Sequence, residues 1–266
     1  ANLKAPSILK SNQVRPTSGV EFVSSRHFPD EVQGDVLINN NIGFLGTKQH
    51  RMIEQDPGFS TEFRQNLLVS KDLNFRPTDL EFAPDGSLYV VDWQNALIGH
   101  MQHSARDPNR DHAHGRIYRV TYPSRPLVKP AKISGASIPQ LLENLKLPEY
   151  RSRYRTRREL RGRNAEEVVK ATLKWVDSLP KGADERLQLE ALWVTWGAKQ
   201  TDFGLLRKLL DSSDHRIRAA AVRVLRFNMD KNPFFGNRKK LLLNAANDEH
   251  GRVRMETVVA ASHLNR

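Results

Sequence analysis

The 266-residue chain contains no cysteine. This absence excludes disulfide bonds, thiolate zinc sites, a covalently attached c-type haem and a cysteine nucleophile. It does not identify the compartment, because extracytoplasmic bacterial proteins can also lack cysteine. No run of eighteen apolar residues occurs, so no transmembrane segment is predicted. The first residues, ANLKAPSILKSNQVRP, lack an initiator methionine and the charged-then-apolar layout of a secretion signal, which indicates a processed start or a fragment.

The formal net charge of +12 is unevenly distributed along the chain: residues 1–132 carry +2 and residues 133–266 carry +10. Such a field attracts anionic partners such as nucleic acid, lipid headgroups or acidic polymers, but a solubilising surface is the favoured interpretation. The densest cluster, RSRYRTRRELRGR, has seven arginines between Arg151 and Arg163. These cannot share one helical face, and we expect Tyr154 and Leu160 to anchor the core. Because no aromatic platform is then left for base stacking, specific nucleic-acid binding is not expected.

The two parts also differ in their hydrophobic period. In the first part, GVEFV, GDVLINN and LEFAPDGSLYVVDW alternate apolar and polar residues or are rich in β-branched and aromatic ones, which predicts strands. The turn residues Pro84-Asp85-Gly86 predict a hairpin within Leu80–Trp93. GRIYRVTY, at residues 115–122, predicts another strand after a long loop. Strand, turn, strand, long loop and strand is the layout of one β-propeller blade.

Behind Pro130 the pattern becomes helical. IPQLLENLKL, AEEVVKATLKWVDSL, ERLQLEALWVTWG, FGLLRKLLDSS, HRIRAAAVRVLRF, RKKLLLNAA and GRVRMETVVAASHL place apolar residues at steps of three and four. HRIRAAAVRVL from His215 recurs as GRVRMETVVAA from Gly251, and SRYRTRREL from Ser152 lies about two such periods earlier. Repeats of this length predict an all-α HEAT-like solenoid over residues 133–266.

At this point the residues carry a family resemblance. The run FRPTDLEFAPDGSLYVVDWQNALIGHMQHSARDPNRDHAHGRIYRVTY, followed by ISGASIPQLLENLKLPEYRSRYRTRREL, resembles the large extracytoplasmic proteins of planctomycetes described as membrane-bound dehydrogenases. The resemblance implies a quinoprotein sugar dehydrogenase-like β-propeller followed by HEAT repeats, often with a c-type haem domain. It also implies an extracytoplasmic location, pyrroloquinoline quinone or calcium as cofactors of the full-length family protein, and a redox partner.

Two departures from the family limit what can be transferred. A propeller needs at least four blades of about 40 residues, and residues 1–132 can supply only two or three. We therefore expect terminal blades of a partial β-propeller, whose partners are the missing blades or other protein chains. The Cys-x-x-Cys-His haem motif is absent because the chain has no cysteine. No catalytic residue is assigned.

Four residues are candidates for contacting a cofactor. In sugar dehydrogenases of this type an arginine of an Arg-Pro pair faces the quinone carboxylates, and the resemblance places Arg76 there. A planar guanidinium pairs bidentately with a carboxylate. Asp79, His100 and Arg116 complete the candidate set. The alternative for Arg76 is structural, through a bond to a neighbouring carbonyl or to Asp79.

The loop between the last two predicted strands is rich in histidine. His100, His103, His112 and His114 are candidate metal ligands, since two histidines three residues apart share a face of a helical turn. Against this, the loop matches no compact zinc signature, and Asp107 and Asp111 are common turn formers. Three arginines nearby would repel a cation. A hydrogen-bonded structural insertion is favoured, with a polar loop facing a cofactor or substrate as a further alternative.

Two functions remain open at this stage. The first is the C-terminal propeller and HEAT portion of an extracytoplasmic quinoprotein-dehydrogenase-like oxidoreductase that is not catalytic by itself. The second is a non-catalytic HEAT-repeat scaffold that binds another protein. The sequence names neither a substrate nor an electron acceptor.

The histidine loop leads to a first prediction. If its role is structural, chelator will leave the thermal midpoint of unfolding unchanged, because a bound metal would stabilise the folded state by mass action. Metal analysis of protein purified without an affinity tag checks this. Stoichiometric zinc or copper that disappears when His100 and His103 are replaced together would overturn the structural interpretation.

Overall fold

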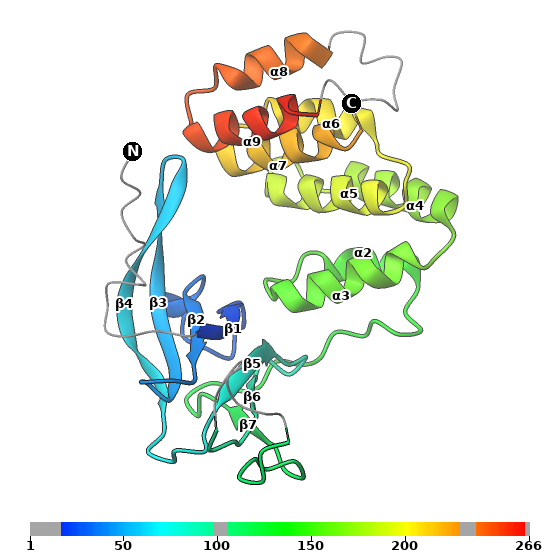
Figure 1. Cartoon of the computed structure of the whole chain (residues 1–266). Helices are drawn as coiled ribbons and strands as arrows, with labels where there is room; N and C mark the ends of the chain where they lie inside the picture. Colours follow the sequence, from blue (N-terminus) through cyan, green and yellow to red (C-terminus); the bar gives the residue numbers. More distant parts are fainter. Residues whose placement is uncertain (1–16, 98–105, 229–237, 264–266) are drawn as a thin grey trace. The chain divides into compact units, whose positions relative to one another are not determined.

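The computed structural model describes residues 17–97, 106–228 and 238–263. The described chain divides into two compact units, with strands first and helices after them (Figure 1). The first unit, here the strand unit, comprises the residues up to Ile53, Phe59–Pro130 and Pro148–Arg151. The second, the helical unit, comprises Glu54–Gly58, Ala131–Leu147 and the residues from Ser152 onward.

The strand unit begins with a four-stranded antiparallel sheet. Its strands are β1 (Thr17–Phe22), β2 (Val36–Asn40), β3 (Gly46–Gln55) and β4 (Gly58–Val69), in the order β1-β2-β3-β4. A short 3-10 turn, η1 (Asp30–Val32), precedes β2. In the register Val20 lies opposite Ile38, and Val36 lies opposite His50. The order of the strands in the sheet therefore follows the order in the chain.

A second, three-stranded sheet contains the predicted hairpin. It consists of β5 (Pro77–Phe82), β6 (Leu88–Asp92) and β7 (Arg116–Val120), all antiparallel. The Asp85 carboxylate accepts the backbone N–H of Ser87 at 3.0 Å, and Gly86 has a φ of 83°. The turn chemistry expected from Pro84-Asp85-Gly86 thus forms this hairpin. The buried core of the strand unit draws on both sheets: Val23, Phe28, Val32, Leu37, Leu80, Phe82, Leu88 and Val90.

The predicted partial β-propeller is wrong. In the described residues the strands form two small open antiparallel sheets, of four and three strands, and neither is a propeller blade ring or a closed barrel. The β3 and β4 strands, of 10 and 12 residues, are also longer than the average strand of five to six residues. Turn residues and alternation define a hairpin locally, but how sheets join depends on tertiary contacts that these signals do not encode. The chain is a mixed β and α protein.

The helical unit carries eight α-helices in the described residues. They are α2 (Ile138–Asn144), α3 (Tyr150–Arg161), α4 (Ala165–Asp177), α5 (Glu185–Gly197), α6 (Phe203–Leu210), α7 (His215–Arg226), α8 (Arg238–Ala246) and α9 (Gly251–Ala261). Side chains of Asn164, Asp184, Asp202 and Asp214 cap the helices that follow them. Such caps satisfy backbone N–H groups that have no partner within the helix. No described helix has the length and apolar composition needed to cross a membrane.

Consecutive helices pack on one another, and so do alternate ones. α4 packs on α5, α6 on α7 and α8 on α9, while α5 contacts α7, and α7 contacts α9. One buried core runs through the unit and includes Leu160, Leu192, Val222 and Val253. Tyr154, expected to anchor this core, is instead 39% exposed.

Arginine side chains mark the sequence repeat in the structure. In three helices a guanidinium group donates to the backbone carbonyl six residues earlier. The pairs are Arg153 to Leu147 at 2.8 Å, Arg218 to Ser212 at 2.9 Å and Arg254 to Asp248 at 2.7 Å. Each arginine therefore fixes the loop that leads into its own helix. The sequence similarity between the segments that start at His215 and Gly251 is therefore matched by equivalent hydrogen bonds of Arg218 and Arg254.

The hairpin turn leads to a second prediction. A Cβ added at Gly86 would lie 2.6 Å from the Ser25 hydroxyl and 2.7 Å from a Val128 methyl, whereas Gly34, with the same φ of 83°, has nothing within 4 Å. Gly86→Ala should lower the free energy of unfolding by about 2–5 kcal/mol, because backbone strain and overlap add. Gly34→Ala, which adds strain alone, should cost about 1 kcal/mol. Urea unfolding measures both, and equal effects would contradict the described turn packing.

Candidate functional site

The carboxylate of Asp92 organises one end of the three-stranded sheet. This side chain is fully buried at the last position of β6. One of its oxygens accepts the backbone N–H groups of Arg76 at 2.7 Å and Gln94 at 2.8 Å. The other accepts Nε of Arg116 at 2.7 Å. Arg116 also donates to Asp72 at 2.8 Å, so it links two carboxylates.

Arg76, the candidate for quinone contact, is buried beside this network. Nε donates to the carbonyl of Asn95 at 2.9 Å, Nη1 to that of Asn41 at 3.0 Å and Nη2 to that of Ala96 at 3.3 Å. Burial lowers the pKa of the guanidinium from its ordinary value. Each of the three nitrogens thus has a carbonyl partner within the strand unit, which is the structural alternative weighed from the sequence. The cofactor role of Arg76 stays a prediction.

The other cofactor candidates do not gather around Arg76. Asp79 lies in β5, where its carboxylate accepts the backbone N–H of Leu80 at 2.8 Å. Arg116 joins Asp92 and Asp72, as described above. His100 lies outside the described residues. The described candidates are therefore engaged in contacts that hold the hairpin and its flanking loops.

The described part of the histidine loop is a hydrogen-bonded turn. Asp111 accepts the N–H groups of Ala113 at 2.9 Å and His114 at 3.0 Å, and its carboxylate lies 3.0 Å from Nδ1 of His114. These bonds, the one from Ala113 foremost, hold the pKa of Asp111 below its ordinary value. His112 is exposed. His100 and His103 lie outside the described residues, so the four-histidine site stays a prediction.

A second group with metal-ligand chemistry lies in the helical unit, at Glu54, His215 and His250. Nε2 of His215 lies 2.8 Å from a Glu54 oxygen, and the two imidazole rings stack with centroids 3.6 Å apart at 12°. Nδ1 of His250 accepts the N–H of Arg252 and so caps α9. Because the rings are nearly parallel, their in-plane lone pairs run side by side, whereas tetrahedral ligands converge on the ion. Nδ1 of His250 also lies 3.8 Å from an Asp56 oxygen, so the stacked pair has two carboxylate neighbours, Glu54 and Asp56.

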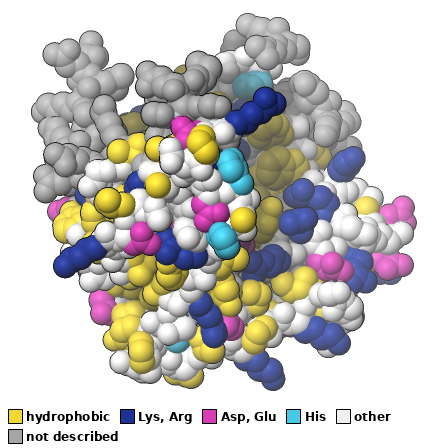
Figure 2. Space-filling view, turned by 60° about the horizontal axis from the view of Figure 1, so that its bottom comes forward, with side chains coloured by type: hydrophobic (Ala, Val, Ile, Leu, Met, Phe, Trp, Pro, Cys, Tyr) yellow, Lys and Arg dark blue, Asp and Glu magenta, His cyan; other side chains and the backbone are white. Residues whose placement is uncertain are grey.

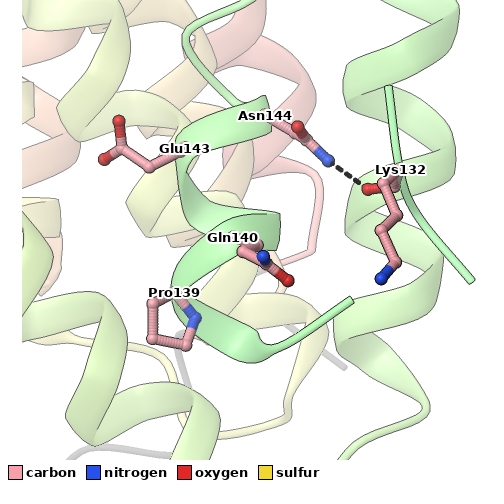
Figure 3. A pocket seen from close by; sticks show the side chains of 5 residues that line it. All are labelled: Lys132, Pro139, Gln140, Glu143 and Asn144. Carbon is pink, nitrogen blue, oxygen red and sulfur yellow. Dashed lines mark hydrogen bonds between the residues drawn. The ribbon is translucent and has the colours of Figure 1, made fainter. Parts of the chain in front are cut away.

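One pocket, of about 410 Å³, lies beside α2 (Figure 3). Its lining residues are Lys132, Pro139, Gln140, Glu143 and Asn144. Asn144 donates to the carbonyl of Lys132 at 2.8 Å. The carboxylate of Glu143 accepts Nε1 of Trp175 at 2.8 Å and Nζ of Lys146 at 2.7 Å. These bonds tie the Glu143 carboxylate and the Asn144 amide, which line the pocket, to neighbouring residues.

Several of the basic residues are paired with acids. In the arginine cluster, Nε of Arg153 and Nη1 of Arg157 donate to the buried carboxylate of Glu190 at 2.9 and 2.5 Å, and Arg163 pairs with Glu159. On the face drawn in Figure 2, basic side chains are spread among acidic and hydrophobic ones. Arg153 and Arg157 thus join α3 to α5 through Glu190, whereas the pair of Arg163 and Glu159 is local.

Sequence reasoning missed a buried histidine in the four-stranded sheet. His50, in β3, is 1% exposed, and neither ring nitrogen has a hydrogen-bond partner among the residues that the structure describes. Its ring meets that of Phe63 edge to face at 5.6 Å. Burial lowers the pKa of His50, and the Lys48 ammonium lowers it further. The sequence of β3 gives no sign of this burial, because Gly46–His50 are all buried although four of these five residues are polar.

His50 leads to a third prediction, on pH dependence. With its folded pKa below the unfolded value of about 6.5, the unfolded state binds the proton first, so stability falls as pH drops from about 7 to 5.5. The slope from this one proton is at most about 1.4 kcal/mol per pH unit. His50→Leu should remove the contribution of His50 to the change of unfolding free energy with pH and leave the contributions of other groups unchanged. Urea unfolding of both proteins across this range tests it, and identical slopes would contradict it.

Comparison with known proteins gives one match. A family model described as a domain of unknown function, DUF7133, matches residues 3–124, which is less than half of the chain. No curated protein matches the chain, and no solved structure does. The match covers most of the strand unit and gives no support for the specific dehydrogenase family that the motifs resemble.

Proposed function

We propose that this chain is a non-catalytic scaffold whose helical unit binds another protein. The observation that carries this proposal is where large hydrophobic side chains are exposed. In the described helical unit most of them lie toward the last helices, at Phe227, Leu243, Met255, Val258 and Val259. Met255, Val258 and Val259 share one face of α9, because residues three and four apart lie together, and exposed apolar groups that gather mark interaction surfaces more often than single exposed ones do.

The chemistry of the strand unit supports the same proposal. Arg76, Arg116 and Asp92 have the residue types that could hold an anionic cofactor, but most of their polar atoms bond to the chain itself, and only Nη2 of Arg116 is buried without a partner among the described residues. A cofactor would have to replace several of these bonds, and a buried group left without a partner costs about 1–3 kcal/mol. The strand unit is thus better suited to shaping its own loops than to receiving a quinone.

The alternative function is a portion of an extracytoplasmic quinoprotein-dehydrogenase-like oxidoreductase. It is supported by the resemblance of Arg76-Pro77 and the hairpin that follows, and so is the extracytoplasmic location. Titration with pyrroloquinoline quinone and calcium, followed by tryptophan fluorescence, separates the two functions. Saturable micromolar binding that Arg76→Lys abolishes would favour the oxidoreductase.

A fourth prediction tests the scaffold directly. A photo-crosslinking amino acid replaces Lys174 in α4, Lys208 in α6 or Val258 in α9, all exposed, in the cells that make the protein. We expect at least one of these positions to give a discrete crosslinked protein, because a scaffold holds its partner against helical surface. Val69, an exposed valine at the end of β4, is the control position. No discrete product from any helical position would contradict the scaffold.

A further inference from the structure

The outer face of α9 carries a row of exposed side chains at helical spacing. Met255, Val258 and Val259 are 38%, 71% and 38% exposed, and Arg254 lies beside them. The opposite face of the helix is buried in the core through Val253 and Ala260. Residues three and four apart share a helix face, so these side chains form one continuous apolar stripe next to one positive charge.

The equivalent stripe is covered in the two preceding repeats. The repeat aligns Met255 and Val258 with Ala219 and Val222 of α7, which are 4% and 1% exposed. In α5 the matching positions are Leu189 and Leu192, at 5% and 0%. The difference follows from the packing, because α7 covers α5 and α9 covers α7. In α9 the same positions are apolar and have no such cover from the described residues.

An arginine occupies the equivalent position in α7 and in α9, as Arg218 and Arg254. Arg218 holds the loop before α7 and also donates to the Asp248 carboxylate, in the loop before α9, at 2.7 and 2.9 Å. Arg254 is the repeat equivalent of Arg218 and holds its own loop in the same way. Its side chain is 45% exposed, and its carboxylate neighbour is Asp56 at 3.6 Å, beyond the distance of a strong ion pair. Suppose that a further helix packed on α9 in the way that α9 packs on α7. An acidic residue in the loop before that helix would then lie next to Arg254, as Asp248 lies next to Arg218.

A second copy of this chain is a poor occupant. Two α9 faces packed together would bring two Arg254 side chains close with no acid beyond Asp56 at 3.6 Å from each, since Glu256 is buried and pairs with Arg223. The net charge of +12 adds repulsion between copies. A different occupant that carries an acidic residue at this position would pair with Arg254, so the repulsion between two arginines would not arise.

We propose that the outer face of α9 binds an amphipathic helix of a partner protein. The helix covers Met255 and Val258 with apolar residues spaced three and four apart, and an acidic residue just before its first turn pairs with Arg254. This proposal rests on the scaffold function and names the surface and the partner's chemistry. Helix-in-groove recognition uses the same anchor spacing.

The test, a fifth prediction, uses a peptide that copies residues 246–263, because this segment covers the equivalent face of α7. Isotope-labelled full-length protein is titrated with the peptide and followed by NMR. We expect saturable shifts on α9 with a Kd of about 0.1–1 mM, since a lone helix must be ordered on binding. Val258→Asp should weaken binding at least about tenfold, equivalent to about 1.4 kcal/mol, whereas Val69→Asp should have no effect.

A charge exchange tests the acidic residue. Arg254→Glu in the protein should weaken binding of the wild-type peptide. A peptide carrying Asp248→Lys and Glu249→Lys should bind the Arg254→Glu variant with restored affinity and should not gain affinity for the wild-type protein. Circular dichroism confirms that each variant folds. No peptide binding, or binding that ignores Val258→Asp, overturns the proposal. Dimerisation that Val258→Asp abolishes also overturns it, because the occupant is then a second copy.

The crosslinking experiment separates this proposal from the scaffold function. Products from the positions in α4 or α6 without one from Val258 would leave the scaffold standing and overturn docking on α9. A product from Val258 whose yield the free peptide reduces supports both. Absence of products from all three helical positions overturns both.

Discussion

Both units depend on arginine side chains that satisfy oxygen atoms inside the chain. Arg76 gives its three guanidinium nitrogens to carbonyls of the loops around β5, and Arg218 bonds a carbonyl of its own loop and a carboxylate of the next repeat. A guanidinium suits this task because it stays charged and its planar donors reach several acceptors at once. Much of the positive charge of this chain therefore has an internal role. Its excess over acidic residues is a poor guide to an anionic partner.

Local chemistry in the sequence predicted local structure well and assembly poorly. Asp85 and Gly86 predicted the hairpin because turn residues act over a few positions. The similar segments that start at His215 and Gly251 are both helices, α7 and α9, in which Arg218 and Arg254 make equivalent bonds, whereas the HEAT-like solenoid stays a prediction. The propeller was wrong because the joining of sheets depends on contacts between residues far apart in the chain.

At the candidate site, too, residue types could be predicted from the sequence and their contacts could not. The sequence singled out Arg76, but its residue type fits a quinone carboxylate and a set of carbonyls equally well, so only its neighbours Asn41, Asn95 and Ala96 reveal what it bonds. His50 could not be found at all, because burial of a polar residue follows from what packs over the strand. The sequence shows that Val258 is apolar, but it does not show that Val258 is exposed. Its repeat equivalent Val222 is also a valine and is buried, so only the structure distinguishes the two.

The bonds from each repeat to the next give the helical array a direction. Arg153 reaches forward to Glu190, Arg218 to Asp248 and Arg223 to Glu256, so within the described residues the α9 repeat has bonds of this kind only with the α7 repeat. In an array with nearest-neighbour coupling, the free energy of local opening decreases toward the less supported end. Amide protons of α8 and α9 should therefore exchange before those of α5 and α7. A helix bound to α9 would support it as α9 supports α7, and it would slow the local opening of helices that it does not touch.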